Sequence, residues 1–395
     1  MSPHATNVSL PFATVSEDAL VGCVSCGLCL PHCPTYRVTG LDAYSPRGRI
    51  SIVNSVRKGD LALDATAIEA LDSCVQCMGC LPACPSGVRY DEIIAPVVVE
   101  IARRRAWRMR FKRLLLSPLG RPLILRSFTW VGAVTQRARL MPARLSLPRL
   151  PIRQPEIVRS PMPTTSDRPR VKLFVGCVMD AWYRPVHVAT VQVLNALGFS
   201  VEPTDSAICC GALHRHAGDA TQASSFEAAC RANLHDDIVV FNSAGCGAQL
   251  SHHIKGAIDV MTLVSRSLER LGEVTEASNE TVAIHDACHS RNILRTHNDA
   301  HIVLGALYKV AALPDDGLCC GAGGAYSFDH PEMAAKILER KYSAIESLGE
   351  VTRLASGNPG CSAHIEAHIP TALRGLSVVH PIELVAERLK KESTA

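Results

Sequence analysis

The second half of this 395-residue chain is an internal repeat built around cysteines, and this repeat limits the folds open to the chain. The motifs "VKLFVGCVMDAW", "ICCG" and "NSAGCGAQ" return as "VAIHDACHSRN", "LCCG" and "GNPGCSAH". The matched pairs are 111, 110 and 115 residues apart: Cys177 and Cys288, Cys209 and Cys319, Cys246 and Cys361. A second cysteine, Cys210 or Cys320, follows in each CCG motif. Such a period predicts a duplicated domain.

Each copy alternates short β-branched stretches with helical ones. The expected order is a strand, a helix, a second strand, the CCG turn, another helix and a third strand. This alternation indicates a parallel sheet with helices packed on it, and the cysteines fall at strand ends, where loops converge on one ligand. We therefore predict two repeated α/β domains, repeat 1 at residues 169–280 and repeat 2 at residues 281–395.

The N-terminal part carries a second cysteine pattern. "CVSCGLCLPHCP" and "CVQCMGCLPACP" both follow C-x2-C-x2-C-x3-C-P, the spacing of [4Fe-4S] ligands in two-cluster ferredoxins. In such ferredoxins the fourth cysteine of each run binds the other cluster. The predicted ligands are Cys23, Cys26, Cys29 and Cys84 for cluster 1, and Cys74, Cys77, Cys80 and Cys33 for cluster 2.

Disulfides and zinc are the alternatives for these cysteines. A chain of this length has no need of disulfides to fold, and its N-terminus lacks the basic and apolar regions of an export signal. Structural zinc sites usually join two CxxC pairs across a longer gap. We therefore expect thiolates bound to iron. No run of 18 uncharged apolar residues occurs, so any membrane contact is expected to be peripheral.

Residues 1–100 are thus predicted to form a largely helical two-cluster module. Helical spacing in "SPRGRISIVNSV" and "LDATAIEALDSC" predicts two helices between the cysteine runs. Arg47, Arg49 and Arg89 lie near these runs. Their charge either stabilises reduced clusters or binds an anionic partner, or they are ordinary solvated or salt-bridged arginines.

Residues 101–168 form a basic amphipathic segment followed by a proline-rich linker. Residues 101–160 contain fifteen Lys or Arg against one acid, Glu156, and aromatic residues lie among them. This pattern favours contact with an anionic membrane or an acidic partner. Nucleic acid is ranked below both, because no nucleic-acid-binding fold signature accompanies the charge.

Both patterns resemble known families. The tandem CCG repeats are similar to the cysteine-rich domains of the heterodisulfide reductase B subunits. Joined to a two-cluster module with "SPRGRI" and "CPSGVRY", the whole chain resembles the iron-sulfur subunits of bacterial glycolate oxidases, and more distantly the C subunits of anaerobic glycerol-3-phosphate dehydrogenases.

The resemblance implies an electron-transfer subunit. Partner FAD subunits would oxidise glycolate or another 2-hydroxy acid, and this chain would pass electrons towards membrane quinone from the cytoplasmic face of the membrane. No catalytic residue is expected here, and no FAD, because no convincing nucleotide-binding motif occurs. Besides two [4Fe-4S] clusters, one or two further clusters are expected on two sets of cysteines: Cys177, Cys209, Cys210 and Cys246, and Cys288, Cys319, Cys320 and Cys361.

One departure keeps a second hypothesis open. Heterodisulfide reductase repeats end in CxxC, whereas Gln249 and His364 replace the last cysteine here. Four thiolates per repeat suit one conventional cluster and weaken the alternative of a CCG-cluster disulfide or quinone reductase. His364 either replaces the missing thiolate or is a hydrogen-bonding neighbour. The latter role is favoured for it and for His214, His216, His285 and His289. Cys230 is expected to be a buried small side chain.

Overall fold

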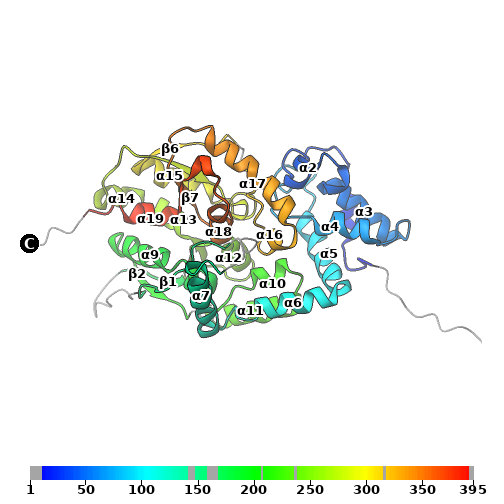
Figure 1. Ribbon diagram of the computed structural model, residues 1–395, viewed down its shortest axis with the longest axis horizontal. Helices are drawn as coiled ribbons and strands as arrows, with labels where there is room; N and C mark the ends of the chain where they lie inside the picture. Colours follow the sequence, from blue (N-terminus) through cyan, green and yellow to red (C-terminus); the bar gives the residue numbers. More distant parts are fainter. Residues whose placement is uncertain are drawn as a thin grey trace, which may run out of the picture.

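The computed structural model describes residues 11–140, 147–157, 168–205, 208–234, 238–314 and 317–390. A helical N-terminal module lies at one end of the molecule, and two α/β repeats lie side by side next to it (Figure 1). The proline-rich linker predicted from the sequence spans residues 159–170, of which residues 159–167 lie outside the described residues. Among the described residues, no helix is both long and apolar enough to cross a membrane.

The N-terminal module consists of short helices connected by the two cysteine loops. They are α1 (Glu17–Val21), α2 (Pro34–Thr39), η1 (Asp42–Tyr44), α3 (Pro46–Lys58), α4 (Ala65–Asp72) and α5 (Tyr90–Arg104). The Ser45 and Asp64 side chains cap α3 and α4 by accepting hydrogen bonds from backbone N–H groups in the first turn. The two helices predicted between the cysteine runs are therefore confirmed, and each has a local cause at its start.

Each repeat contains one parallel four-stranded sheet, and the two sheets share one strand order. The first, in the order β2-β1-β3-β4, consists of β1 (Arg170–Phe174), β2 (Ser200–Pro203), β3 (Val239–Phe241) and β4 (Ala257–Asp259). The second, in the order β6-β5-β7-β8, consists of β5 (Thr281–His285), β6 (Lys309–Ala311), β7 (Arg353–Ser356) and β8 (Ser377–Val379). The predicted α/β duplication is confirmed. The expected three strands per copy are wrong, because β4 and β8 form a fourth.

Helices surround both sheets. In repeat 1 they are α8 (Val178–Trp182), α9 (Arg184–Ala196), α10 (Ala212–His216), α11 (Ala220–Asn233), α12 (Ala244–Leu250), α13 (Val260–Ser265) and α14 (Leu268–Val274). In repeat 2 they are η2 (Ser290–Leu294), α15 (His297–Leu307), α16 (Tyr326–Asp329), α17 (Pro331–Glu346), α18 (Pro359–Ala367), η3 (Thr371–Leu373) and α19 (Pro381–Ala386).

The two repeats share a hydrophobic core. Helix α19 of repeat 2 packs on α9 of repeat 1, and α13 of repeat 1 packs on α15 of repeat 2. Leu194, Val264, Leu304 and Leu384 from these four helices are fully buried in one cluster. Each such side chain contributes about 1.5 to 3 kcal/mol when it leaves water. The repeats therefore hold each other in a fixed arrangement.

The basic segment forms two helices, α6 (Ala106–Leu116) and α7 (Pro122–Arg137), along the repeats (Figure 1). Much of its positive charge points inward, into ion pairs with acids of all three other parts of the chain. These pairs are Arg105 with Asp72, Arg108 and Lys112 with Asp329, Arg113 with Asp219, and Arg126 with Asp180. These ion pairs hold the two helices to the rest of the protein. From the sequence alone, the same basic residues were expected to contact a membrane or a partner.

Candidate metal centres

The cysteines of the repeats gather at the carboxyl ends of the parallel strands. Cys177 follows the central strand β1, and Cys246 lies in the first turn of α12, just after its neighbour β3. Cys288 and Cys361 occupy the matching places after β5 and β7. In each sheet the chain leaves these two strands towards opposite edges, and such a switch point is where open parallel sheets bind ligands.

In repeat 1 the four predicted thiols converge in two close pairs. The Sγ atoms of Cys177 and Cys209 are 3.6 Å apart, and those of Cys210 and Cys246 are 3.2 Å apart. Contacts with Cys177 and Cys210 lower the pKa of Cys209 well below its ordinary value, whereas the pKa of Cys210 is raised. Thiols packed this closely are stabilised when a cation replaces their protons.

Cys230, as expected, stands apart from this set. It is buried in α11, its S–H donates to the Cys209 carbonyl at 3.3 Å, and burial raises the pKa of its thiol to about 12.

In repeat 2 the matching thiols also converge, and a fifth joins them from the N-terminal module. Cys319 contacts Cys288, Cys320 and Cys77, and these contacts together with burial raise the pKa of its thiol well above the ordinary value. Cys320 in turn contacts Cys361. Cys77, which belongs to the second cysteine run, has its pKa lowered mainly by the hydrogen bond to Cys319.

The glycine of each CCG motif makes this packing feasible. Gly211 and Gly321 have left-handed φ angles of 80° and 90°. Their N–H groups donate to the thiols of Cys209 and Cys319, each at 3.4 Å. A side chain at Gly321 would lie 2.9 Å from the carbonyl oxygen of Ala334 in α17, so only glycine fits this turn without displacement.

A bridging asparagine links the cysteine helices of the two repeats. The Asn358 amide donates to the Cys361 thiol at 3.3 Å, and its oxygen accepts from Ser243 at 3.2 Å and from the Gly245 N–H at 3.1 Å. Ser243 caps α12, the helix that carries Cys246. The two thiol sets therefore lie on either side of one hydrogen-bonded junction.

Two of the histidines near these sets are buried beside a single polar neighbour. Neither ring nitrogen of His285, which is 2% exposed, makes a close hydrogen bond, but the ring lies beside the Cys320 thiol and lowers its pKa. The Nδ1 of His214 lies 3.8 Å from the Asp219 carboxylate. For both, the role of hydrogen-bonding neighbour stays a prediction. His289 does act as such a neighbour, because its Nε2 lies 3.2 Å from the Gln76 carbonyl. At the two positions where the fifth cysteine is missing, Gln249 donates a hydrogen bond to Glu227, and the His364 ring contacts His368.

In the N-terminal module, one cavity collects the ligands predicted for cluster 1. Its walls include Cys23, Cys26, Cys29 and Cys84, which come from opposite ends of the module's sequence, and Cys80 also borders it. Burial raises the pKa of Cys29. Arg47 lies at the rim, where it donates to the Ser25 carbonyl at 3.1 Å and to Asp42 at 2.8 Å.

The ligands predicted for cluster 2 surround a buried arginine. Arg49 is 2% exposed and donates to the Ala70 carbonyl at 2.8 Å, Thr35 at 2.9 Å and Ser73 at 2.8 Å. Its guanidinium also lies 3.9 Å from the Cys33 sulfur. Burial lowers the pKa of Arg49, but Cys74, Tyr90 and Cys33 outweigh this effect and raise it. Of the three arginines considered from the sequence, Arg49 is buried beside predicted cluster ligands, Arg47 borders the cavity of cluster 1, and Arg89 is exposed.

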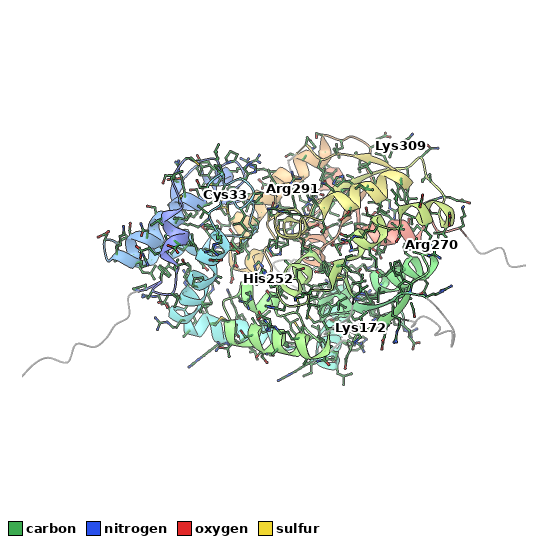
Figure 2. All side chains as sticks on the ribbon, turned by 180° about the vertical axis from the view of Figure 1, so that it is seen from behind. Cys33, Lys172, His252, Arg270, Arg291 and Lys309 are labelled. Atoms are coloured by element: carbon green, nitrogen blue, oxygen red, sulfur yellow. The ribbon has the colours of Figure 1, made fainter. Side chains whose placement is uncertain are left out.

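Cys80 completes the second set. Burial raises the pKa of its thiol well above the ordinary value, and the neighbouring thiols of Cys77, Cys74 and Cys33 raise it further. Cys33 is therefore close to the second cysteine run. Figure 2 labels it in the N-terminal module, just before α2, the helix that packs on α17 of repeat 2.

The second cysteine loop also contacts repeat 2. Asn292 donates to the Cys77 carbonyl at 2.9 Å, and Tyr326 donates to the Ser73 carbonyl at 3.1 Å. Val75 is buried against Cys319 and Tyr326. A side chain at Gly323 would lie 2.9 Å from Val75, so the glycines of "CGAGGAY" make room for this loop.

All 17 cysteines of the chain fall within the described ranges, and all are free thiols. This donor chemistry fits iron–sulfur clusters, because clusters take several thiolates at fixed local spacing and buried thiols with no such partner are costly to ionise. The fold and the sites thus define an iron–sulfur protein with a ferredoxin-type module and two cysteine-rich α/β repeats.

Comparisons with known proteins agree with this class. Residues 19–88 match the 4Fe-4S dicluster domain family, and residues 171–251 and 282–366 each match the cysteine-rich domain family. The glycolate oxidase iron-sulfur subunit of Escherichia coli (strain K12) is 29% identical over 96% of this chain and 97% of its own length. A probable glycolate oxidase iron-sulfur subunit of Bacillus subtilis (strain 168) is 29% identical over 94% of this chain and 95% of its own length.

A third relative matches only part of this chain. Lactate utilization protein A of Geobacillus kaustophilus (strain HTA426) is 26% identical over 55% of this chain and 99% of its own length. The full-length similarity is therefore to the iron-sulfur subunits of glycolate oxidases, as the sequence motifs indicated, and the chain carries iron–sulfur clusters.

The crossed assignment of the N-terminal ligands leads to a first prediction. Cys84→Ala should remove the cluster held with Cys23, Cys26 and Cys29, and Cys33→Ala should remove the one held with Cys74, Cys77 and Cys80. Each variant of the full chain should lose about four irons. Only Cys33→Ala should alter the EPR signal of the site at Cys319, because Cys77 touches that site. Loss of the same cluster in both variants would refute the crossing.

Proposed function

We propose that this chain is the electron-transfer subunit of a flavin-dependent glycolate or 2-hydroxy-acid oxidase or dehydrogenase. Substrate oxidation takes place on partner FAD subunits, and electrons pass through this chain towards membrane quinone. Iron–sulfur clusters supply one-electron redox chemistry in such a subunit. The full-length similarity to two glycolate oxidase iron-sulfur subunits supports the proposal.

The contact between Cys77 and Cys319 is the observation that carries this proposal. It joins one ligand set of the N-terminal module to the ligand set of repeat 2. Asn358 then joins the ligand sets of the two repeats. The protein therefore holds successive ligand sets close together, and short distances of this kind are what electron transfer requires.

The alternative, a disulfide or quinone reductase acting at a CCG cluster, has less support. It calls for a fifth ligand at the position of Gln249 or His364. The Gln249 side chain donates to Glu227 at 2.7 Å, away from the thiols. Loss of the fifth thiolate therefore favours a conducting role over a catalytic one.

Flavin bleaching in the assembled complex tests the proposed function. Cys319→Ala should abolish quinone reduction while the partner's flavin is still bleached by hydroxy acid in a single turnover. Cys230→Ala is the matched control, because Cys230 is equally buried but outside the ligand set. Loss of flavin bleaching in Cys319→Ala, with FAD content and assembly intact, would place substrate chemistry in this subunit and refute the proposal.

Helices α6 and α7 are the proposed contact with the cytoplasmic face of the membrane. Their ion pairs face the protein, while large apolar side chains face outward, with Trp107 at 79% exposed. The others are Phe111, Leu114, Leu115, Leu123, Ile124, Phe128, Trp130 and Val131. Exposed apolar surface of this kind marks a membrane or protein contact.

This arrangement changes the expected salt response. Because much of the basic charge is used inside the protein, membrane attachment should depend mainly on the apolar side chains and only weakly on salt. Trp107→Ser combined with Phe111→Ser and Leu115→Ser should therefore abolish flotation of the complex with anionic liposomes. The matched control replaces Val21, Val24 and Leu41, which are exposed in the N-terminal module. Flotation that survives the α6 changes would make these helices a partner-binding face instead.

A further inference from the structure

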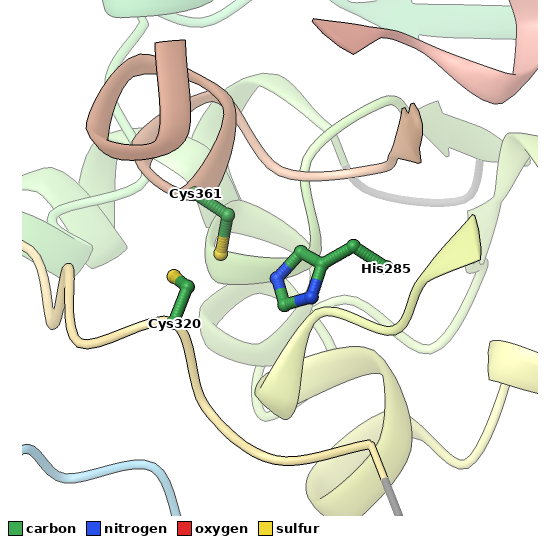
Figure 3. Close-up of side chains that lie close together, drawn as sticks. All are labelled: His285, Cys320 and Cys361. Atoms are coloured by element: carbon green, nitrogen blue, oxygen red, sulfur yellow. The ribbon is translucent and has the colours of Figure 1, made fainter. Parts of the chain in front are cut away.

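A buried histidine distinguishes the two repeats at their otherwise matching thiol sites. His285 ends strand β5, and the pairing of β5 with β7 sets it opposite Ser356. One of its ring nitrogens lies within 4.8 Å of the sulfurs of both Cys320 and Cys361, and those two sulfurs also lie within 4.8 Å of each other. Figure 3 shows one ring nitrogen turned towards the Cys361 sulfur.

The corresponding position in repeat 1 is Phe174, because the first cysteines of the repeats are 111 residues apart. Phe174 is buried and packs in one cluster with Cys210. An apolar ring thus fills this place in repeat 1, whereas repeat 2 has a nitrogen donor there. The two repeats share a fold and eight matched cysteines but present different donor sets.

The state of His285 points to a ligand. A buried imidazole with two unpaired nitrogens forfeits about 1 to 3 kcal/mol per group unless something binds it. Within the described residues, the ring lies beside the thiols of Cys320, whose pKa it lowers, and Cys361, and thiols bind metals as thiolates. A metal atom bound by His285, Cys320 and Cys361 would give each of these three buried side chains a partner.

The size of the triad suits a single metal atom. Sulfur and nitrogen donors at about 2.0 to 2.3 Å from one tetrahedral metal lie about 3.5 to 3.8 Å from each other. A set spanning at most 4.8 Å closes around such an atom with small side-chain movements. Both zinc and the iron of an iron–sulfur cluster accept two thiolates and an imidazole.

We propose that His285 is a metal ligand of repeat 2 and shares one metal atom with Cys320 and Cys361, so that the two repeats hold chemically different sites. The inference rests on the proposed binding of metal by repeat 2. If the metal is cluster iron, the imidazole donor raises its reduction potential relative to an all-thiolate site, as it does in Rieske centres.

His364 is the competing candidate. It is buried, one ring nitrogen is unpaired, and it occupies the position of the missing fifth cysteine. It lies outside the compact triad, and its ring contacts His368. Repeat 1 supplies a natural replacement for each histidine, because Phe174 matches His285 and Gln249 matches His364.

The test uses the full chain, purified anaerobically after growth with both iron and zinc. Reduced protein with ¹⁴N-histidine or ¹⁵N-histidine is compared by pulsed EPR, and iron, zinc and sulfide are counted per chain. If the metal is iron, a histidine nitrogen coupling should be present in the wild type and in His364→Gln, and absent in His285→Phe. His285→Cys should keep the metal, lose the coupling and lower the reduction potential.

If the metal is zinc, one zinc per chain should be lost in His285→Phe and kept in His364→Gln. That outcome supports the ligand assignment but removes repeat 2 from the electron path, so it separates this inference from the proposed function. Unchanged metal content and an unchanged nitrogen coupling in His285→Phe would overturn the inference. So would loss of the coupling or the zinc in His364→Gln alone. Isotope labelling of the wild type keeps the test valid even if His285→Phe fails to fold.

Discussion

Replacing Arg49 by methionine should destabilise the N-terminal module by at least about 3 kcal/mol and empty its second cluster site. The guanidinium is buried and donates to three protein oxygens from α2, α4 and the residue after α4. Methionine would remove the donor from all three oxygens, leaving only the bonds that the Ser73 and Thr35 hydroxyls donate to the Ala70 and Tyr44 carbonyls. It would also remove the positive charge that lies between Cys33 and Cys74 and offsets the negative charge of bound thiolates.

Anaerobic urea unfolding and iron content measure this effect. Arg49→Lys keeps the charge but not the forked geometry, so it should fall between the wild type and Arg49→Met. Arg89→Met is the matched control, because Arg89 is 61% exposed and its ion pair with Glu92 lies at the surface. Equal unfolding midpoints for Arg49→Met and Arg89→Met would show that Arg49 has no special role.

Replacing Gly323 by alanine should separate the N-terminal module from repeat 2. An added Cβ would lie 2.7 Å from the Cβ of Tyr326, 2.9 Å from Val75 and 3.1 Å from the Val75 carbonyl oxygen. Overpacking of this kind costs about 1 to 3 kcal/mol, and the loop that carries Cys77 is the part able to move. The contact between Cys77 and Cys319 should therefore open, with a large loss of electron transfer through the subunit.

Gly349→Ala controls for backbone strain. Gly349 also has a left-handed φ angle, 74° against 47° for Gly323, but nothing lies within 4 Å of an added Cβ. Both variants incur about 1 to 2 kcal/mol of conformational strain, and only Gly323→Ala meets a neighbour. Hydrogen exchange at residues 74–80 should rise in Gly323→Ala alone. Equal exchange in both variants would mean that the loop does not depend on this glycine.

The thiol sets were predictable from the sequence because cluster ligands need fixed local spacing, and such spacing is visible in a linear pattern. The duplication was predictable for the same reason, since Cys177 and Cys288 mark the same point of two copies. Strands β4 and β8 were missed because each has only three residues, too few for a periodic pattern, and neither leads into a repeated cysteine motif, as the equally short β3 and β6 do.

Contacts between segments that are distant in the sequence could not be predicted from local sequence patterns. Nothing in the local sequence brings Cys77 to Cys319, because that contact depends on how the module docks. The positive charge of the basic segment was visible in the sequence, but its ion pairs with Asp219 and Asp329 were not. The difference at His285 could be seen in the sequence, because aligning the two repeats places it opposite Phe174. Only the structure shows that its ring is buried without a close hydrogen bond, which is what suggests a ligand.

EPR of the full chain at partial reduction tests the central claim most directly, namely that the ligand sets at Cys77 and Cys319 hold iron–sulfur clusters in contact. Wild-type protein should show a signal split by magnetic coupling between the two sites. Cys319→Ala should lose that splitting while the N-terminal module keeps about eight irons, and Cys230→Ala should retain it. A fully loaded wild-type protein whose signals are the simple sum of uncoupled clusters would contradict the account.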